Sequence, residues 1–503
     1  DELQDTNTIQ YAWLRVLAGI NAKITIVGDD DQSIYGRRGA RIENLQCFET
    51  EFPGARTLRL EQNYRSTGVI LKAANALIAH NDGRLGKNLW TDGSDGDPIQ
   101  LYAALNEQDE ARYVVEQILG FIEQGAARSD MAILYRSNAQ SRVFEERLLQ
   151  RAIPYRVYGG LRFFERQEIK DTLAYLRLCE NREDDASFDR VVNQPPRGIG
   201  ERTLGVVRER ARLDKISLWA AALAVQSGDV LNARARNALA AFMQSLDALA
   251  GDINGIELAE KVEHVVQCAG LKDHYAKEKG EKGQARLENL DELVNAAREF
   301  EYETEDDEEL EPLAAFLSHA ALEAGEGQAD KWQDCVQLMT LHSAKGLEFD
   351  QVFLCGLEEG LFPHQRSVEE AGRLEEERRL CYVGVTRARK QLMLSYAEHR
   401  RLHGSESYCM PSRFIHEIPA ELVNEIRPRI QVSRPFETNS SSAAFREAPC
   451  GDLGLGQRVQ HTKFGEGVVL NYEGQGSHAR VQVNFESSGT KWLVVAYANL
   501  QPA

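Results

Sequence analysis

The sequence of 503 residues has few cysteines, and none of them stand in a paired pattern. Its eight cysteines are scattered, and no two have the C-x-x-C spacing that zinc sites and redox centres use. The sequence also lacks an apolar run of the roughly 18 residues that a membrane span needs. We therefore expect buried, reduced thiols in a cytoplasmic chain without a zinc site, a disulfide framework or a membrane segment.

An excess of basic residues, the usual signature of nucleic-acid binding, is also lacking. The chain has 59 Lys and Arg residues against 78 Asp and Glu residues, which gives a net charge of −19. Much of this excess is local, because the stretch 299–311 contains nine acids and no base and is typical of a solvated loop. The charge weakens a DNA-binding hypothesis without excluding it, since a protein that grips a few nucleotides needs only a local basic channel.

Apolar runs typical of buried strands alternate with helical patterns in two parts of the chain, whereas the part between them, 164–328, has a helical pattern throughout. This alternation predicts an α/β fold with an all-α insertion. The predicted strands are 23–27, 131–135, 336–341, 352–355 and 392–396, and the clearest flanking helices are 109–124 and 141–151.

The end of the chain has a different character. Residues 428–451 are rich in Ser, Pro and small residues and predict a flexible linker. Beyond them, Val481, Val483 and Phe485 alternate with polar residues, and glycines supply turns. We expect a small β-barrel of the SH3 or Tudor type there.

Acidic residues stand at two places where a phosphate site is expected. Asp1 and Glu2 open the chain, and the predicted strand 23–27 runs into the segment Gly28-Asp29-Asp30-Asp31-Gln32. In open α/β sheets ligands lie at the carboxyl ends of strands. Carboxylates and a Gln at such ends can hold Mg²⁺, orient a water molecule and sense a terminal phosphate.

Two arginine-bearing segments complete this pattern: Leu60–Thr67 contains Tyr64 and Arg65, and the stretch 375–388 ends in Thr-Arg387-Ala. Two arginines that reach a γ-phosphate are what phosphoryl transfer requires, because negative charge builds on the equatorial oxygens.

Five motifs in order, DELQDTN, GDDDQSIYG, EQNYRST, TLHSAKGLEF and EEERRLCYVGVTRA, extend over nearly 400 residues. In this order they resemble motifs II to VI of the UvrD/PcrA/Rep family of superfamily 1 DNA helicases. The resemblance implies RecA-like, P-loop-type motor domains, of which the first is incomplete. The implied division is 1–61 for the first motor domain, 62–158 with 332–429 for the second, 159–331 for the helical insertion, 430–452 for a linker and 453–503 for the barrel. The barrel resembles the end of UvrD-like and PcrA-like members, whereas Rep-like members lack it. Of the two remaining branches, the UvrD branch is preferred.

The resemblance also implies roles for single residues at an ATP site. Asp1 would hold Mg²⁺, Glu2 would polarise the attacking water, and Gln32 would couple the γ-phosphate to DNA contacts. Tyr64 would stack on adenine and Glu348 would bind the ribose. Arg65 and Arg387 would contact the γ-phosphate.

On the DNA side, the family pattern matches a single-strand channel and a loop that contacts duplex DNA. The channel residues are Tyr35, Arg37, Arg38, Arg136, Asn138, Thr340 and His342, and the loop residues are Gly198, Gly200 and Thr203. Arg37 replaces an aromatic residue that is usual in the family, although a guanidinium can still stack on a base. His403 stands at the tip of the hairpin that parts the duplex, where the family often has an aromatic residue.

A P-loop, GxxxxGK[ST], does not occur in the sequence, and the segment Gly83–Asn88 has the wrong spacing and last residue for one. We therefore expect a chain cut at its amino-terminal side, just before motif II, that binds ATP poorly on its own.

Three functions remain open at this point. The first is an ATP- and Mg²⁺-dependent 3′→5′ helicase in bacterial DNA repair, acting on single strands and junctions as a monomer or dimer in the nucleoid. The implied protein partners are MutL, UvrB and RNA polymerase. The second is a non-catalytic DNA- and RNA polymerase-binding module. The third, a helicase–nuclease subunit, predicts a carboxylate-rich nuclease domain where a linker and barrel are expected instead.

Overall fold

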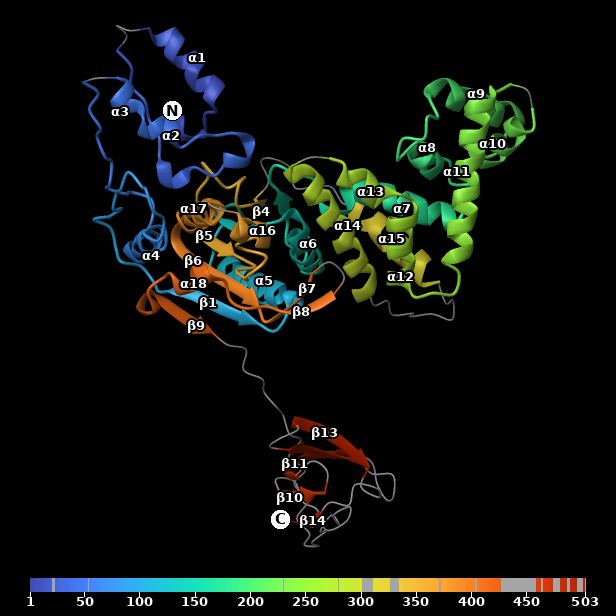
Figure 1. Cartoon of the computed structure of the whole chain (residues 1–503). Helices are drawn as coiled ribbons and strands as arrows, with labels where there is room; N and C mark the ends of the chain where they lie inside the picture. Colours follow the sequence, from blue (N-terminus) through green and yellow to red (C-terminus); the bar gives the residue numbers. More distant parts are fainter. Residues whose placement is uncertain are drawn as a thin grey trace. The chain divides into compact units, whose positions relative to one another are not determined.

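The computed structural model forms two units, 1–429 and 430–503, and each is described here by itself (Figure 1). In the first unit the structure describes residues 1–19, 23–52, 54–228, 230–278, 280–300, 311–325, 334–370, 372–402 and 405–426. In the second it describes 458–462, 465–473, 480–485, 489–494 and 501–502. The predicted linker 428–451, most of the acidic stretch 299–311, and His403 lie outside the described residues.

A seven-stranded sheet organises the first unit, in the order β3-β4-β2-β5-β6-β1-β9, with every neighbouring pair parallel. The strands are β1 (Ile99–Ala104), β2 (Met131–Tyr135), β3 (Tyr155–Val157), β4 (Val336–Thr340), β5 (Phe349–Leu354), β6 (Ala388–Ala397) and β9 (Val423–Ile426). Four of the five predicted strands are therefore confirmed. Because strands from 99–157 and 336–426 interleave, the sheet is built from two stretches that lie far apart in sequence.

Helices cover both faces of this sheet, which makes it a three-layer α/β structure. Successive β2 residues face opposite sides: Ala132 and Leu134 pack with α4 and α17, whereas Met131 and Ile133 pack with α5 and α6. All of β2 is buried, which explains its continuous apolar sequence. The helices and short 3-10 turns of this part are α4 (Gly68–Ile78), α5 (Glu107–Glu123), α6 (Ser141–Gln150), α16 (Gln365–Glu369), α17 (Arg373–Val385), α18 (Arg413–His416), η4 (Arg128–Asp130), η5 (Asn138–Gln140), η6 (Phe163–Glu165) and η7 (Ala420–Leu422).

The predicted strand at 23–27 is wrong. These residues have no strand assignment, and Val27 is 55% exposed. Among the described residues, a hydrogen bond from Leu3 N–H to the Val27 carbonyl (3.2 Å) joins the segment to its neighbour, but no ladder forms. An apolar run becomes a strand only where a second strand accepts its backbone groups. The elements here are η1 (Leu3–Asp5), α1 (Thr8–Ala18), η2 (Asp30–Gln32), η3 (Gly36–Arg38), α2 (Glu43–Gln46) and α3 (Phe48–Glu51).

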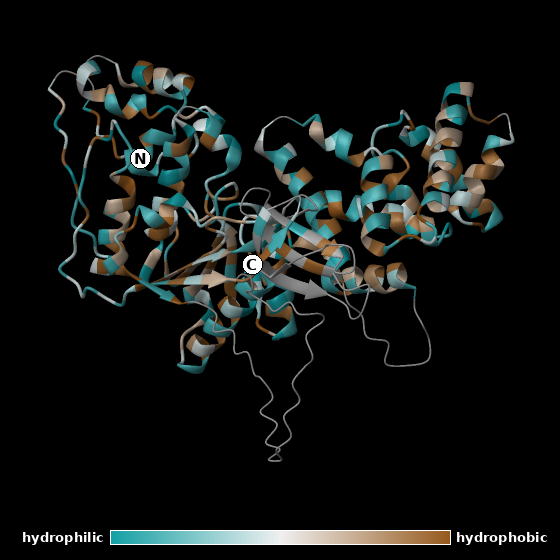
Figure 2. Cartoon of the chain, turned by 60° about the horizontal axis from the view of Figure 1, so that its bottom comes forward, coloured by the Kyte–Doolittle hydropathy of each residue, from teal (hydrophilic) through white to brown (hydrophobic). Residues whose placement is uncertain are grey.

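The helical prediction for 164–328 is confirmed wherever residues are described. The helices share one apolar core, and polar side chains cap several of them; Asn232, for example, accepts a hydrogen bond from Ala235 N–H (2.8 Å). Figure 2 shows hydrophilic and hydrophobic residues alternating along these helices, as expected where one side of a helix is buried. The helices are α7 (Gln167–Glu180), α8 (Asp185–Val191), α9 (Glu201–Asp214), α10 (Leu218–Gln226), α11 (Ala233–Asp252), α12 (Leu258–Cys268), α13 (Leu271–Ala276), α14 (Glu281–Glu299) and α15 (Pro312–Gly325).

Two small antiparallel sheets complete the chain. In the first unit, β7 (His399–Leu402) pairs with β8 (Ser405–Tyr408) as a hairpin that follows β6. The second unit is a five-stranded sheet in which Val481, Val483 and Phe485 are buried together with Val459, so the predicted alternation is confirmed. Its strands are β10 (Arg458–His461), β11 (Gly465–Glu473), β12 (Arg480–Phe485), β13 (Gly489–Val494) and β14 (Gln501–Pro502), in the order β13-β12-β11-β10-β14. No helix among the described residues is long and apolar enough to cross a membrane.

Because α17 packs closely on the sheet, we expect alanine substitution of two glycines to have different effects on stability. A Cβ at Gly384 in α17 would lie 2.5 Å from Cδ2 of the buried Leu341, whereas a Cβ at Gly120 in α5 would have nothing within 4 Å. Gly384→Ala should therefore lower the free energy of unfolding by about 1–3 kcal/mol through overpacking. Gly120→Ala should leave it unchanged or raise it by up to about 1 kcal/mol, through helix propensity. Urea unfolding of both variants measures the difference, and equal midpoints would contradict it.

Candidate functional site

An open cavity of about 390 Å³ brings together the residues expected at the base and ribose of a nucleotide. Tyr64, Arg65 and Glu348 line it, with Arg389 beside them. The Tyr64 ring is 86% exposed and is available for stacking. Arg65 Nε pairs with Glu348, and the hydrogen bond holds the pKa of that carboxyl below its usual value. The sequence pattern placed Tyr64 and Glu348 almost 300 residues apart, and folding makes them neighbours.

Arg387 lies behind this cavity and is 2% exposed. Its guanidinium donates to the carbonyls of Val383 (3.0 Å) and Leu347 (3.1 Å) and to Thr386 Oγ1 (3.2 Å). Burial, reinforced by the charge of Arg65, lowers the pKa of Arg387 to about 10. Arg65 Nη1 in turn donates to the Thr386 carbonyl (3.4 Å), so the two arginines meet at Thr386. A pair of cations this close favours an anion between them.

The carboxylates that open the chain meet a lysine from a distant motif. Lys345 Nζ lies 3.0 Å from Glu2 Oε2 and 2.6 Å from Asp5 Oδ2, and it donates to the Gln32 carbonyl (3.0 Å). Asp1 is exposed, and its Oδ1 accepts a hydrogen bond from Glu2 N–H (3.0 Å). An exposed carboxylate of this kind fits Mg²⁺, a hard cation that takes oxygen ligands and keeps several waters.

Gln32 and the three aspartates before it form a second acidic cluster. Gln32 Nε2 donates to Asp29 Oδ2 (2.6 Å). Carboxylate oxygens of Asp29, Asp30 and Asp31 lie within 4.8 Å of one another, a spacing that could hold a metal ion. Basic and amide groups of the segment Gly83–Asn88 already contact these carboxylates. They are Arg84, which binds both oxygens of Asp31 (2.6 Å each), Lys87, which pairs with Asp29, and Leu85 N–H, which donates to Asp30 (2.7 Å).

The pairing of Gly83–Asn88 with the acidic loop was not predicted from the sequence, in which this segment stands out only as an imperfect P-loop pattern. The available signal was the spacing of Arg84 and Lys87, which have two residues between them, together with the three consecutive acids Asp29, Asp30 and Asp31. Because protein groups already contact all three aspartates, Asp1 remains the better candidate for Mg²⁺.

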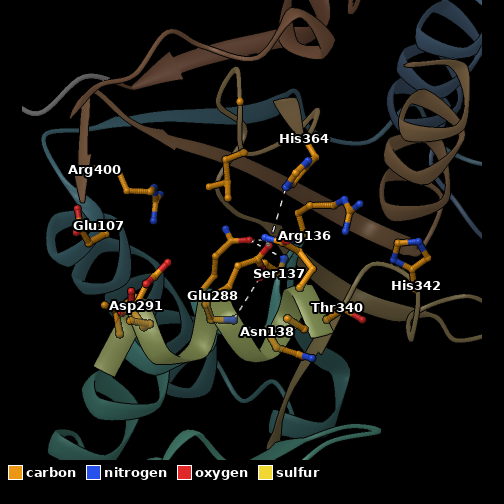
Figure 3. Close-up of a pocket in the computed structure, with 18 of the residues that line it drawn as sticks. Glu107, Arg136, Ser137, Asn138, Glu288, Asp291, Thr340, His342, His364 and Arg400 are labelled. Atoms are coloured by element: carbon orange, nitrogen blue, oxygen red, sulfur yellow. Dashed lines mark hydrogen bonds and ion pairs between the residues drawn. The ribbon is translucent and has the colours of Figure 1, made fainter. Parts of the chain in front are cut away.

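Most of the expected DNA-contacting residues line a separate cavity of about 360 Å³ (Figure 3). They come from four segments: η3, the loop after β2, the end of β4 and the turn that follows it. The lining residues that the sequence predicted are Arg37, Arg38, Arg136, Asn138, Thr340 and His342. Guanidinium, amide, hydroxyl and imidazole groups on one wall are what a channel for a phosphate backbone requires.

Tyr35 is not among the residues that line this cavity, but it supports the wall. Its hydroxyl donates to the His342 carbonyl (3.2 Å), and its ring lies under the Arg38 guanidinium, 5.0 Å from the ring centroid. Lys345 Nζ lies 5.5 Å from the same centroid. Tyr35 therefore touches residues of both sites. A base-stacking role for the ring requires Arg38 to move off it.

Two buried groups set the electrostatics of the cavity. Arg136 makes a bidentate ion pair with Glu377 (2.8 Å and 3.0 Å), whose pKa lies below its usual value even though burial alone would raise it. Burial, followed by the charge of Arg136, lowers the pKa of His342 to about 3. His342 is therefore neutral at physiological pH, and the positive charge of this wall comes from the arginines.

The loop with Gly198 and Gly200 is placed elsewhere, at the start of α9, and shares no residue with the cavity. Gly198 has a φ of +78°, a conformation that favours glycine, and a Cβ on either glycine would meet nothing within 4 Å. Thr203 is buried in the first turn of α9. An open glycine turn of this kind lets a phosphate approach the backbone.

The opposite wall of the cavity was not predicted from the sequence; it is formed by α14, by β7 and by the first residue of α5. Its charged and polar lining residues are Glu107, Gln284, Glu288, Asp291, Glu292, Asn295, Arg400 and Arg401, and Ser137 and His364 lie beside the predicted residues. Ser137 stands between two residues that the sequence did select, so adjacency could have identified it. The α14 residues carry no motif, and only folding brings that helix to the cavity.

Comparisons with known proteins agree with this arrangement. Residues 58–399 match the UvrD-like helicase C-terminal domain, residues 1–53 the UvrD/REP helicase N-terminal domain, and residues 455–501 the PcrA/UvrD tudor domain. The chain is 61% identical to DNA helicase II of Escherichia coli over 501 residues, covering all of this chain and 69% of that protein. It is 54% identical to DNA helicase II of Haemophilus influenzae, again over all of this chain and 69% of that protein. It is 40% identical to the ATP-dependent DNA helicase PcrA of Bacillus subtilis, over all of this chain and 70% of that protein.

A large parallel α/β sheet flanked by helices is the fold expected of a helicase motor domain. The matches make the class specific: the chain belongs to the UvrD-like helicases, and it is a DNA helicase chain. Its similarity to the two DNA helicase II proteins exceeds its similarity to that PcrA protein.

Lys345→Met should destabilise the first 46 residues, which extend to the end of α2. The ammonium group is 6% exposed, and its loss leaves Asp5 and the Gln32 carbonyl without this partner. The free energy of unfolding should fall by about 2 kcal/mol, and limited proteolysis should cut within the first 46 residues faster. Lys390→Met is the control, because Lys390 is 67% exposed and pairs with Asp350 at the surface. Equal protease resistance of the two variants would contradict the role given to Lys345.

Because His342 is neutral in the folded protein, we expect the free energy of unfolding to depend on pH. Its folded-state pKa of about 3 lies below the unfolded value, so its contribution is fully present above about pH 6.5 and declines as the pH falls. Urea midpoints of the unsubstituted chain should therefore drop between about pH 6.5 and pH 5. His342→Asn should make this drop shallower, whereas substitution of the exposed His80 by Asn should not. Parallel pH profiles for all three proteins would refute the assignment.

Proposed function

We propose that this chain belongs to an ATP-dependent motor that moves along single-stranded DNA from 3′ to 5′ and unwinds duplexes during mismatch and nucleotide excision repair. Of all the observations, one carries the proposal furthest: a single segment, 340–348, serves both cavities. Thr340 and His342 line the arginine-walled cavity, Lys345 contacts Glu2 and Gln32, and Glu348 lines the cavity with Tyr64.

Such a segment gives a direct path between nucleotide and DNA. A DNA strand that displaces Thr340 or His342 shifts the same turn that holds Lys345 against the carboxylates. An anion that draws Arg65 away from Glu348 acts on the other end of that turn. Two sites that bias one element are thermodynamically coupled, and the coupling is reciprocal. A stepping motor requires such coupling.

The roles in this proposal follow the family pattern. Asp1 would hold Mg²⁺, Glu2 would polarise the attacking water, and Arg65 and Arg387 would stabilise charge on the transferred phosphate. Since Lys345 pairs with Glu2, Glu2 must leave Lys345 to act as a base. Arg387 must likewise turn out of its carbonyl contacts to reach a phosphate.

The domain division proposed is 1–61 and 62–158 with 332–429 for two RecA-like motor domains, 159–331 for the insertion, and 453–503 for a barrel that docks protein partners. MutL, UvrB and RNA polymerase are the partners proposed for it, on the basis of the family resemblance. Because the sequence contains no GxxxxGK[ST] pattern, we propose that this chain alone binds single-stranded DNA without hydrolysing ATP.

The test uses two forms of the protein and two DNA substrates. This chain alone should bind a fluorescent oligo-dT, and a form extended at its amino terminus should hydrolyse ATP when single-stranded DNA is added. The extended form should unwind a duplex with a 3′ tail and leave one with a 5′ tail intact. Absence of DNA-stimulated hydrolysis in the extended form, or unwinding from the 5′ tail, would overturn the proposal.

A further inference from the structure

One wall of the arginine-lined cavity is acidic, which a channel for a polyanion does not need. Helix α14 presents Glu288, Asp291 and Glu292 to the cavity, opposite Arg136 and its neighbours (Figure 3). Carboxylates repel backbone phosphates in a poorly screened cleft. Their presence therefore calls for an explanation in terms of what each carboxylate contacts.

Two of the three carboxylates have partners within the protein framework. Glu292 binds Arg142 Nε (2.6 Å), and Asp291 binds Lys272 Nζ (2.9 Å). Arg142 is 2% exposed and also binds Glu146 (2.9 Å) and Glu299 (2.8 Å), so it fixes α14 to α6. Glu292 therefore ties α14 to α6, and Asp291 ties it to α13 within the helical insertion.

Glu288 differs from them because its carboxylate faces the DNA-side wall. Ser137 Oγ donates to Glu288 Oε2, and His364 Nε2 lies 3.9 Å from Oε1 (Figure 3). On its own helix it accepts a hydrogen bond from Gln284 Nε2 (3.1 Å). Glu288 thus bridges the cavity from the insertion to the motor domain.

The groups that hold Glu288 are of the kind that holds a phosphate. Ser137 lies between Arg136 and Asn138 on the wall where a strand is expected, and hydroxyl, amide and imidazole groups commonly bind phosphate oxygens. His364 is half-buried beside Arg136, and its burial lowers its pKa, so it offers a neutral ring. A carboxylate and a phosphodiester are both anionic oxygen acceptors, and the same donors can serve either one.

We propose that Glu288 occupies the place of a DNA backbone phosphate in the free protein and must leave Ser137 before a strand is seated. The inference rests on the proposed function, because it takes the cavity to be the site of single-stranded DNA. Anchoring of α14 by Arg142 and by the Arg166–Asn289 hydrogen bond (2.8 Å) means that the Glu288 side chain moves while the helix stays docked. Glu288 thereby sets the affinity of the cavity.

Asp291 provides a matched control. Both side chains are on α14, both line the cavity, both are 16% exposed, and substitution by the amide removes one negative charge in each case. Binding of fluorescent oligo-dT to the full chain is measured by anisotropy at low salt. Glu288→Gln should lower the dissociation constant about tenfold, because the free-energy change is about that of one charge-assisted hydrogen bond. Asp291→Asn should change it less than about twofold, because Asp291 pairs with Lys272 and not with the Ser137 hydroxyl.

A double variant tests the displacement itself. If the phosphate takes over the Ser137 hydroxyl, Ser137→Ala should reduce the gain produced by Glu288→Gln, so that the two effects do not add. Equal tightening by Glu288→Gln and Asp291→Asn would overturn the inference in favour of a general charge effect. Unchanged affinity for Glu288→Gln, with normal binding by the unsubstituted chain, would overturn it while leaving the proposed function intact. Failure of every protein to bind would overturn both.

Discussion

The ammonium group of Lys345 is the contact on which the two sites depend. It is almost fully buried, and it joins Glu2, Asp5 and the Gln32 carbonyl to a turn that otherwise belongs to the parallel sheet. A buried cation is stable only when anions and carbonyls surround it, so the first segments of the chain must lie against this turn. The same turn carries His342 into the arginine-lined cavity and Glu348 into the cavity with Tyr64. One ion cluster therefore helps to place a turn that contributes to both cavities.

Charge in this molecule is balanced locally. The chain as a whole is strongly acidic, yet several carboxylates near the two cavities have cationic partners, as Glu377 has in Arg136 and Glu348 in Arg65. Glu288 is held instead by a hydroxyl, an amide and an imidazole. In such a cluster a ligand does not meet bare charge; it exchanges one partner for another. The affinity for DNA then depends on the number of arginines and on how strongly the protein holds the carboxylate that the phosphate replaces. Glu288 is the clearest example of such a carboxylate.

Parts of the fold followed from the sequence because the signals were local. The strand β2 is apolar along its whole length, and the helical insertion repeats an apolar spacing over many turns, so each element is specified by its own residues. The segment 23–27 shows the limit of this reasoning. Three of its five residues, Ile24, Ile26 and Val27, are apolar, but no described neighbour pairs with the segment in a ladder, and a strand needs a partner.

The sequence by itself determined the family, the α/β class, the helical insertion, one wall of the arginine-lined cavity and the residues Tyr64, Arg65 and Glu348 of the other cavity, because ordered motifs carry those residues. Only the tertiary structure decided which groups oppose them: α14 across from Ser137, Lys345 against Glu2, and Gly83–Asn88 on the aspartates. Motifs mark residues that act on a ligand. The residues that balance their charge come from distant segments, and those on α14 and in Gly83–Asn88 stand in no motif, because any acid or base that folding places within a few ångströms can perform that task.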